Sequence, residues 1–315
     1  MTNLAEAPAQ AAAAPPTHRA DAGAPRISVG RVLAWVVLIL FILITLFPFY
    51  WMLRTALSNN RTLFAHSSSW LPVDFTWGAF KRVLGLSSFA EAQAEGGSGG
   101  SIQFWLYLRN SIIVSTAITV GQVFFSALAA YAFARLRWPG RDKVFFLFLC
   151  ALMVPPIFTM LPNFVLVKDL GLLNTFPGIV APYFFMTPFA VFFLRQFFLG
   201  VNREIEEAAM LDGAGHLTLF FRIILPLSSA PITTLGILTF INAWNEYFWP
   251  SLVGQEENVR VLTVALSIFK SQTPQGTPDW AGLMAGTLVA AVPVILLFLA
   301  FGRRIVNSIQ FSGIK

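Results

Sequence analysis

A short polar segment between two long apolar runs carries the residues whose types and spacing point most clearly to a function. It reads Glu-Ala-Ala from Glu207, with a glycine at 213 and the sequence Ile-x-Leu-Pro from Ile223. Asn202 can cap a helix here, because its side chain can accept hydrogen bonds from backbone N–H groups of the first turn. The glutamates that follow it favour the positive end of the helix dipole. The sequence therefore predicts a short helix after Asn202.

One face of this expected helix suits contact with another protein. Ile205, Ala208, Ala209 and Asp212 follow the i, i+3, i+4, i+7 spacing of a single helical face, and most of these side chains are small. Small side chains let a helix seat closely in a groove of a partner. Gly213 is a natural position for the chain to leave the helix. The alternative is an amphipathic helix on the membrane surface. The expected contact residues are Glu207, Ala208, Ala209, Asp212, Gly213, Leu225 and Pro226.

A second polar cluster lies near the end of a later apolar run. Asn242, Asn245 and Trp249 would share one face of a continuous helix at i, i+3 and i+7, with Glu246 beside them. Aromatic rings stack on sugar rings while amides bind hydroxyls, and an ionisable residue within a membrane is a functional-site hypothesis by default. The alternative is an interfacial aromatic belt with hydrogen bonds between helices. The candidate residues of a solute path are Asn242, Trp244, Asn245, Glu246 and Trp249.

Composition places both motifs in a membrane protein. Charged residues make up 11% of the chain and hydrophobic residues 56%, with a mean hydropathy of +0.69; a soluble domain has about 25% charged residues. Apolar runs of about 20 residues can cross a bilayer as helices, which satisfy their own backbone groups there. The sequence predicts an all-α polytopic membrane protein. Its six transmembrane helices are expected near residues 32–53, 108–134, 144–167, 178–198, 231–253 and 281–301.

Prolines interrupt two of the expected spans. Pro155, Pro156 and Pro162 fall in the third span, and Pro182 and Pro188 in the fourth. A proline inside a helix removes a backbone hydrogen bond and kinks it. Such breaks often lie near transport pathways or hinges, but membrane helices also tolerate proline more readily than soluble ones. The sequence leaves these two interpretations open.

Basic residues favour an orientation with both termini in the cytoplasm. In this orientation 13 of the 21 Lys and Arg residues fall in inner segments, as the positive-inside bias predicts. The cluster at 135–143 is the strongest single indication, and it places the segment around Glu207 in the cytoplasm as well. The same bias explains most of the net charge of +6, so no nucleic-acid partner is expected.

Composition also divides the chain outside the spans. The first 30 residues are rich in Ala and Pro and predict a disordered cytoplasmic tail. The first span is too long for a signal-peptide core and is expected to stay as an anchor. The expected parts are the tail 1–30, the first helix 31–53, an extracytoplasmic loop 54–107 with a flexible Gly/Ser linker at 95–101, a five-helix core 108–301 that includes the loop 202–228, and a cytoplasmic tail 302–315.

No motif for enzymatic chemistry is visible in the sequence. It contains neither the G-x-x-x-x-G-K-[ST] pattern that cradles phosphates nor the H-E-x-x-H pattern that binds zinc. Cys150 is the single cysteine, so no disulfide framework is expected. The sequence predicts no metal site, no cofactor and no enzymatic activity on this chain. An integral membrane enzyme is the alternative from another functional class.

The motif from Glu207 to Pro226 resembles the cytoplasmic-loop signature of the membrane subunits of binding-protein-dependent ABC importers, and every position of that signature matches. The whole chain is similar to the six-span permeases of the carbohydrate, maltose-type branch, in which the Trp-Asn-Glu cluster at 244–246 is typical. The resemblance implies a type I ABC importer permease fold, a place in the bacterial plasma (inner) membrane and half of a sugar translocation pore. An importer of another solute, such as a peptide or amino acid, is the alternative.

The resemblance also implies a set of partners. These are a second related permease subunit in a heterodimer, an ABC ATPase dimer that binds ATP and Mg, an extracytoplasmic sugar-binding protein, and membrane lipid. The loop 202–228 would couple the ATPase to the pore, and the tail 302–315 would make a second contact with it. The outer loop 254–280 is far longer than the roughly 2–8 residues that connect neighbouring helices. Its tip would contact the binding protein through Ser271, Gln272, Thr273, Pro274, Gln275, Gly276 and Thr277.

Overall fold

The computed structural model describes residues 29–66, 68–97, 102–271 and 278–310, and these residues form helices and loops with no strand among them. The expected tail up to residue 28, the linker residues 98–101, the tip residues 272–277 and the residues 311–315 lie outside the described part. The chain divides into two units, Met1–Pro48 and Phe49–Lys315, and each is considered by itself.

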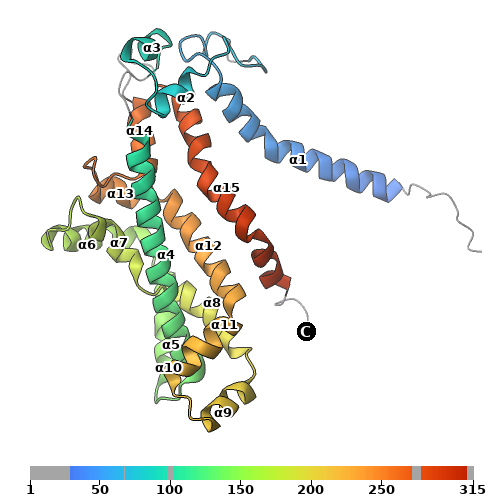
Figure 1. Cartoon of the computed structure of the whole chain (residues 1–315), viewed down its shortest axis with the longest axis vertical. Coiled ribbons are helices and arrows are strands. Elements are labelled where there is room, and N and C mark those ends of the chain that lie inside the picture. The colour runs from blue at the N-terminus through green and yellow to red at the C-terminus, as the bar shows by residue number, and fades with distance from the viewer. Residues whose placement is uncertain (1–28, 67, 98–101, 272–277, 311–315) are drawn as a thin grey trace, which may run out of the picture. The chain divides into compact units, whose positions relative to one another are not determined.

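The first unit is described as the greater part of helix α1 (Val29–Ala56). Figure 1 draws the described residues of this unit, 29–48, as helix. The side chains of residues 29–48 are all exposed, although most of them are apolar. An exposed apolar helix of 28 residues is long enough to cross a bilayer. This agrees with the first expected span.

Two helices of the second unit could each cross a membrane without a break. These are α4 (Phe104–Arg135) and α15 (Trp280–Gln310), the latter over residues 280–302. The other spans are bent pairs. The helices α5 (Arg141–Cys150) and η1 (Ala151–Met153) meet α6 (Pro156–Asp169) at 96°. The bend between α7 (Phe176–Phe184) and α8 (Pro188–Leu199) is 46°.

The third bent pair follows the loop that holds the Glu-Ala-Ala motif. Its first part, His216–Leu227, meets α12 (Ser229–Asn245) at 79°. If each bent pair is counted as one span, the described chain contains the six spans that the sequence predicted. The largest differences in the ends are in the last two spans. The fifth span begins at His216 instead of 231, inside the expected loop 202–228, and α12 stops at Asn245, short of the expected end at 253. Helix α15 continues past the expected end at 301 to Gln310.

Prolines mark two of the three bends. Pro155 and Pro156 lie at the break before α6, and Pro188 is the first residue of α8. Proline lacks the N–H that an interior turn needs, but it suits the first turn of a new helix. Thr187 caps α8 by accepting a hydrogen bond from the N–H of Ala190 at 3.4 Å. The sequence predicted interruptions here, and the structure shows that they separate distinct helices. Pro162 and Pro182 were expected to interrupt the same spans, but they lie inside α6 and α7.

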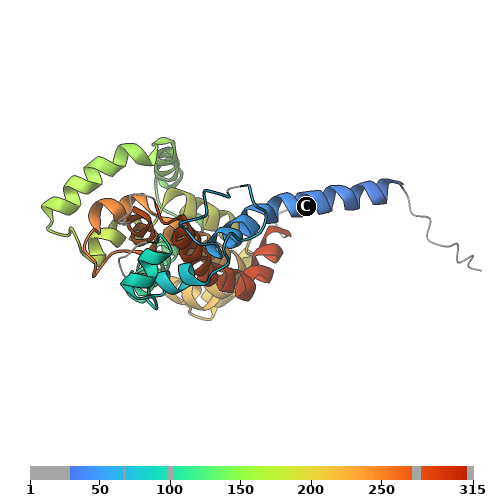
Figure 2. The same cartoon turned by 90° about the horizontal axis from the view of Figure 1, so that it is seen from above.

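Helix α4 is the central element of the second unit. It packs against α7, α8 and α12, and α12 in turn packs against α15. The close approach of α7 depends on Gly121, because a Cβ added there would lie 2.4 Å from the Phe184 ring. By contrast, α6 projects from the side of this unit in both views (Figures 1 and 2) and exposes Phe158 and Leu161. Helix α4 therefore connects the two ends of the unit.

The expected outer loop 54–107 is folded over its described residues. It contains α2 (Gly78–Val83) and α3 (Phe89–Ala94), and α2 packs on α15 (Figure 1). Arg82 is buried and donates from Nε and Nη2 to the two carboxylate oxygens of Asp279 at 3.1 and 3.2 Å. Its Nη1 donates to Glu95. The prediction that a flexible linker begins at Glu95 is therefore wrong for that residue, because its carboxylate pairs with a buried cation.

Candidate functional site

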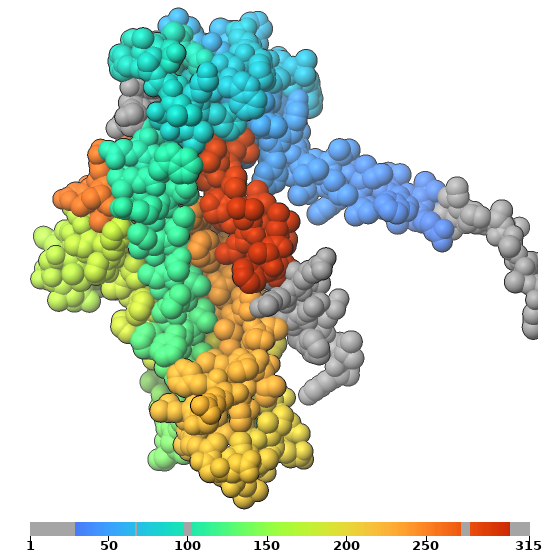
Figure 3. Space-filling model, in the orientation of Figure 1, coloured from blue at the N-terminus to red at the C-terminus, as the bar shows by residue number. Residues whose placement is uncertain are grey.

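The segment after Asn202 forms helix α9 (Arg203–Leu211), as the sequence predicted. It lies at the end of the second unit opposite α2 and α3 (Figures 1 and 3). Asn202 accepts a hydrogen bond from the N–H of Glu204 at 3.1 Å, so it caps the helix. The capping expectation is confirmed.

The helix ends at a glycine whose backbone angles are special. Gly213 has φ +87°, and its N–H donates to the carbonyl of Met210 at 3.0 Å. The N–H of Ala214 donates to the carbonyl of Ala209 at 2.9 Å, which completes a Schellman motif. A Cβ added at Gly213 would meet nothing within 4 Å. The glycine is therefore required for its left-handed conformation rather than for a close approach.

The helix face that the sequence assigned to a partner is open. Ile205 is 44% exposed, Glu207, Ala208 and Asp212 are exposed, and Ala209 is half-buried. A groove of about 530 Å³ lies between α9 and the end of α4. It is lined by Arg135, Leu136, Arg137, Trp138, Arg203, Glu206, Glu207, Met210 and His216. Small exposed side chains beside a largely basic groove form a surface that suits a second protein.

A buried ion pair fastens α9 to α4, and the sequence analysis did not find it. Nε of Arg135, the last residue of α4, lies 3.1 Å from Oε1 of Glu206. The two side chains are 3% and 8% exposed. The arginine also donates from Nη2 to the carbonyls of Phe198 and Val201. The sequence shows an arginine at the end of a span and three glutamates in the later loop, but it does not show which glutamate pairs with that arginine.

The Ile-x-Leu-Pro part of the motif lies where the loop returns to the membrane. After α10 (His216–Leu219), the π-helix η2 (Phe220–Ile224) leads into α11 (Leu225–Leu227). Leu225 is half-buried against the cluster that surrounds the end of α4, and Pro226 is exposed in the first turn of α11. The bend into α12 follows directly. These residues therefore shape the turn, whereas the residues of α9 provide the exposed face.

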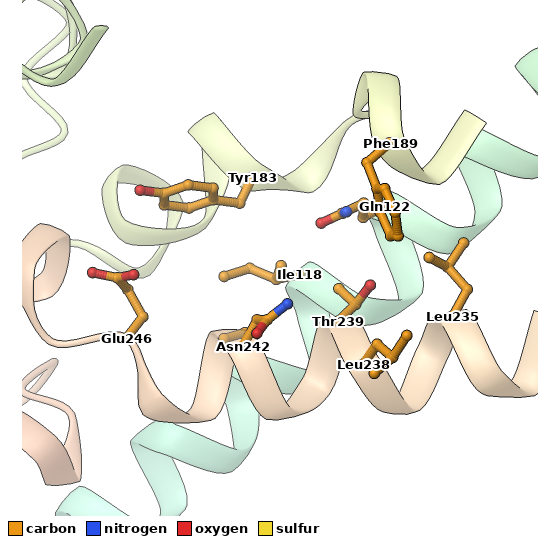
Figure 4. Close-up of a pocket in the computed structure, with 10 residues that line it drawn as sticks. Ile118, Gln122, Tyr183, Phe189, Leu235, Leu238, Thr239, Asn242 and Glu246 are labelled. Atoms are coloured by element: carbon orange, nitrogen blue, oxygen red, sulfur yellow. The ribbon is translucent and has the colours of Figure 1, made fainter. Parts of the chain in front are cut away.

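A cavity of about 140 Å³ lies among α4, α7, α8 and α12 (Figure 4). Ile118 and Gln122 belong to α4, Tyr183 to α7 and Phe189 to α8. Helix α12 and the residue after it supply Leu235, Leu238, Thr239, Asn242, Ala243 and Glu246. Gln122 also donates to the hydroxyl of Thr187 at 3.0 Å. The sequence prediction of the path did not include Gln122, Tyr183 and Thr239, although a polar side chain inside an apolar run is a signal that could have indicated them.

Asn242 and Glu246 are therefore the two residues of the predicted solute path that line this cavity. The prediction that Asn242, Asn245 and Trp249 share one helical face is wrong, because α12 ends at Asn245. Oε1 of Glu246 accepts hydrogen bonds from the N–H groups of Phe248 and Trp249, at 2.9 and 3.1 Å, where α13 (Phe248–Val253) begins. An acceptor at this position favours a new helix over continuation of the old one.

The two tryptophans of the cluster have structural contacts instead. Trp244 is 5% exposed, stacks on Phe240, and donates from Nε1 to the carbonyl of Ala290 at 3.2 Å. Trp249 is 2% exposed and donates to the carbonyl of Ile179 at 3.1 Å. Neither ring faces the cavity. Trp244 and Asn245 line a different groove, of about 630 Å³, between α12, α14 (Leu262–Ser271) and α15.

The predicted tip of the outer loop lies almost wholly outside the described residues. Ser271 is the last residue of α14, and 272–277 are not described. The two flanks of this segment are close together, since the N–H of Asp279 donates to the carbonyl of Lys270 at 3.1 Å. In the described ranges, no three His, Cys, Asp or Glu side chains are grouped so that they could hold a metal ion.

Comparison with known proteins identifies the family. The family model described as "Binding-protein-dependent transport system inner membrane component" matches residues 122–310. The probable ABC transporter permease protein YurM of Bacillus subtilis (strain 168) is 34% identical, over 91% of this chain and 89% of its own. The arabinooligosaccharides transport system permease protein AraQ of the same strain is 31% identical, over 92% and 98%.

A relative with a different named solute and one solved structure complete the comparison. The sn-glycerol-3-phosphate transport system permease protein UgpE of Pectobacterium atrosepticum is 31% identical, over 89% of this chain and 96% of its own. A chain of a bacterial ABC transporter involved in the import of the acidic polysaccharide alginate has the same fold, with a TM-score of 0.72 and 24% identity over 86% of this chain and 95% of that one. This confirms the predicted permease fold. The residues that match the family model, 122–310, include α9, α12 and most of the residues that line the cavity. The chain belongs to the family of inner membrane components of binding-protein-dependent transport systems.

Proposed function

We propose that this chain is the permease subunit of an ATP-driven sugar importer in a bacterial plasma membrane, with both termini in the cytoplasm. The observation that carries the proposal is that one continuous helix, α4, reaches from the exposed helix α9 to a cavity among the spans that has five polar lining residues. AraQ, a relative whose name specifies arabinooligosaccharides, supports a sugar as the solute. The matched residues and the absence of a P-loop from the sequence agree with a transport role that needs a separate ATPase.

The ATPase contact is proposed for α9. Ala208 and Asp212 are exposed and small, so the helix can seat closely in a groove of an ABC ATPase dimer, which would bind the ATP and Mg. Glu207 is exposed beside them. The basic groove next to α9 offers Arg137 and Arg203 to acidic groups of the same partner. The C-terminal residues 302–315 are proposed as a second contact with this ATPase.

The path from this contact to the solute runs along α4. A displacement of α9 acts on Arg135 through the buried pair with Glu206. Gln122 and Ile118 lie on the same helix, so about 20 Å of rigid helix, at 1.5 Å per residue, separates Arg135 from Gln122. Because α4 packs against α7, α8 and α12, we expect it to move as a rigid body. We therefore place the coupling route through Arg135 rather than through the exposed Glu207 alone.

The cavity is proposed as this chain's half of the solute path, completed by a second, related permease subunit. Asn242, Gln122 and Thr239 can hydrogen-bond to sugar hydroxyls, and Phe189 offers an aromatic ring. The extracytoplasmic sugar-binding protein is proposed to contact the loop around Ser271 and 272–277, whose flanks meet at Lys270 and Asp279.

The proposal is tested by substitutions in α9 and at the glycine that follows it, measured in the assembled transporter. Glu207→Lys replaces a negative charge on the exposed face of α9 by a positive one. Gly213→Asp places a residue with a Cβ at a backbone φ of +87°. Both variants should insert and assemble, yet lose uptake and the stimulation of ATP hydrolysis by loaded binding protein. Asp169→Lys, at the exposed last residue of α6, is the charge-reversal control. Normal uptake by both α9 variants would refute the assignment.

A second candidate function is favoured by one observation. UgpE shows that the same fold also occurs in a permease named for sn-glycerol-3-phosphate, which is an anion rather than a neutral sugar. The two candidates differ in the charge that the solute path must accept. The residues that line the cavity provide a physical basis for choosing between them.

A further inference from the structure

The cavity among α4, α7, α8 and α12 contains one charged side chain. Of its ten lining residues, Glu246 is acidic and none is basic. Four others are polar but neutral: Gln122, Tyr183, Thr239 and Asn242. Figure 4 shows Glu246 and Tyr183 near one end of the cavity, Gln122 and Phe189 near the other, and Asn242 between them. A solute in this space would therefore meet one fixed negative charge.

The position of that charge is fixed by the backbone. Oε1 of Glu246 accepts the N–H groups of Phe248 and Trp249, and the ring of Trp249 is itself held by carbonyls of α7. The second carboxylate oxygen, Oε2, accepts no hydrogen bond from the described residues. The side chain thus has one oxygen that maintains the turn between α12 and α13 and one that is available to a solute.

We infer that Glu246 makes this path selective for neutral carbohydrate and against anionic solutes such as phosphorylated polyols or uronates. The inference rests on the proposed function of the cavity as a solute path. A carboxylate accepts hydrogen bonds from sugar hydroxyls but offers no donor to a phosphate or a second carboxylate. Like charges in a low-dielectric cleft repel more strongly than in water. A cleft lined by one sign of charge changes the local concentration and the entry rate of ions by about tenfold or more.

The test measures charge selectivity without knowledge of the solute. In a Cys150→Ser background, Leu238→Cys places a thiol on the cavity wall, where the leucine is 41% exposed. The complex with its partner permease and ATPase, in detergent, is treated with methanethiosulfonate reagents that are anionic, cationic or neutral. The labelling rates are normalised to Leu86→Cys, a position that is 71% exposed outside the cavity.

The anionic reagent should react with Leu238→Cys at least about tenfold more slowly than the cationic one after this normalisation. Glu246→Gln should bring the two rates to within about twofold of each other, because the amide keeps an acceptor for the two N–H groups but removes the charge. Glu256→Gln, an exposed carboxylate on the loop after α13, should leave the ratio unchanged. If Glu246→Gln does not assemble, Asn242→Asp is the second variant and should slow the anionic reagent further.

The outcomes separate this inference from the proposed function. Equal normalised rates in the unsubstituted cavity would overturn the charge selectivity, while labelling that changes with trapped nucleotide would still support a solute path. If no reagent reaches Leu238→Cys, with or without trapped nucleotide, both the path and its charge selectivity are refuted. A ratio that Glu246→Gln leaves unchanged would show that another group creates the selectivity, and the role given to Glu246 would be wrong.

Discussion

Two buried arginines, one at each end of the second unit, pair with carboxylates in different ways. Arg82, at the α2–α3 end, has both oxygens of Asp279 and a carboxylate oxygen of Glu95 as partners. Asp279 Oδ1 also accepts the N–H of Gly282 at 2.7 Å, which caps α15. Arg135, at the α9 end, lies 3.1 Å from Glu206, but the Nε and Oε1 atoms do not meet with hydrogen-bond geometry.

The difference suggests different roles for the two pairs. A bidentate pair with every oxygen engaged holds its helices in one arrangement, because any shift breaks several bonds at once. The buried pair of Arg135 and Glu206 has no aligned hydrogen bond, so its two charges attract each other over a range of orientations and keep α9 attached to α4 while the pair changes its geometry. We therefore expect the Arg82 pair to serve stability and the Arg135 pair to serve communication between α9 and the cavity.

The largest expected effect is loss of stability at the Arg82 pair. Asp279→Ala leaves a buried arginine without its bidentate partner and removes the cap of α15, so the free energy of unfolding should fall by about 3–5 kcal/mol. Thermal unfolding of the purified complex, followed by size-exclusion chromatography, measures the loss. Glu257→Ala removes an exposed carboxylate from the neighbouring loop and should change little. A stable Asp279→Ala complex would remove the distinction between the two pairs.

At the Arg135 pair the expected effect is on coupling more than on stability. Glu206→Gln removes the charge, but Arg135 keeps its bonds to the carbonyls of Phe198 and Val201. Stability should fall by about 1–3 kcal/mol, while binding-protein stimulation of ATP hydrolysis should be lost and basal hydrolysis retained. Glu204→Gln makes the same chemical change at an exposed position of α9 and should keep the stimulation. Full stimulation in Glu206→Gln would contradict the coupling route.

A double-mutant cycle sharpens this second prediction. If the pair acts as a unit, Arg135→Gln combined with Glu206→Gln should lower the free energy of unfolding by less than the sum of the two single variants. Additive losses would show that the two residues act separately.

A smaller effect is expected at the end of α9. Gly213→Ala forces a Cβ into the left-handed region, which costs about 1–2 kcal/mol, and should loosen the helix without changing the exposed face. Hydrogen exchange of the amides in 203–212 should become faster. Gly215→Ala is the matched control, because Gly215 has φ −79° and an added Cβ would meet nothing within 4 Å. Equal exchange in the two variants would show that φ at 213 does not limit the helix.

The smallest effect on stability is expected between α14 and α15. Removal of residues 273–276 leaves Lys270, Asp279 and the Arg82 pair in place, so thermal unfolding should stay within about 0.5 kcal/mol of the parent, as surface changes usually do. Binding-protein stimulation of ATP hydrolysis should decrease and basal hydrolysis should not. Stimulation that survives the deletion would show that the loop only connects the two helices.

Much of the fold followed from local sequence signals. The cap at Asn202, the turn at Gly213 and the apolar spans depend on neighbouring residues, so the sequence predicted them. The breaks near Pro155 and Pro188 were indicated by residue type, but their angles of 96° and 46° depend on packing between helices. The features that could be predicted are therefore those that depend on residues close together in the sequence.

The candidate site was predicted less completely because its residues meet across distant parts of the chain. The helix was expected to continue past Glu246, although Pro250 lacks the N–H that would bond to the carbonyl of Glu246 in a continuous helix. In the structure α12 ends before this point, and two backbone N–H groups at the start of α13 bond to the Glu246 carboxylate. The pairs of Arg82 with Asp279 and of Arg135 with Glu206 join segments far apart in the sequence. The side chains of Trp244 and Trp249 looked suited to a sugar, but packing against α15 and α7 uses their indole N–H groups.

The size and lining of the cavity also determine how it treats water. A space of about 140 Å³ with five polar lining residues is large enough for several water molecules when no solute is present. If the cavity is the solute path that we propose, sugar hydroxyls would replace water at Asn242, Gln122 and Thr239, so a solute would exchange hydrogen bonds instead of gaining new ones. Such an exchange would let a solute enter and leave without a deep energy minimum.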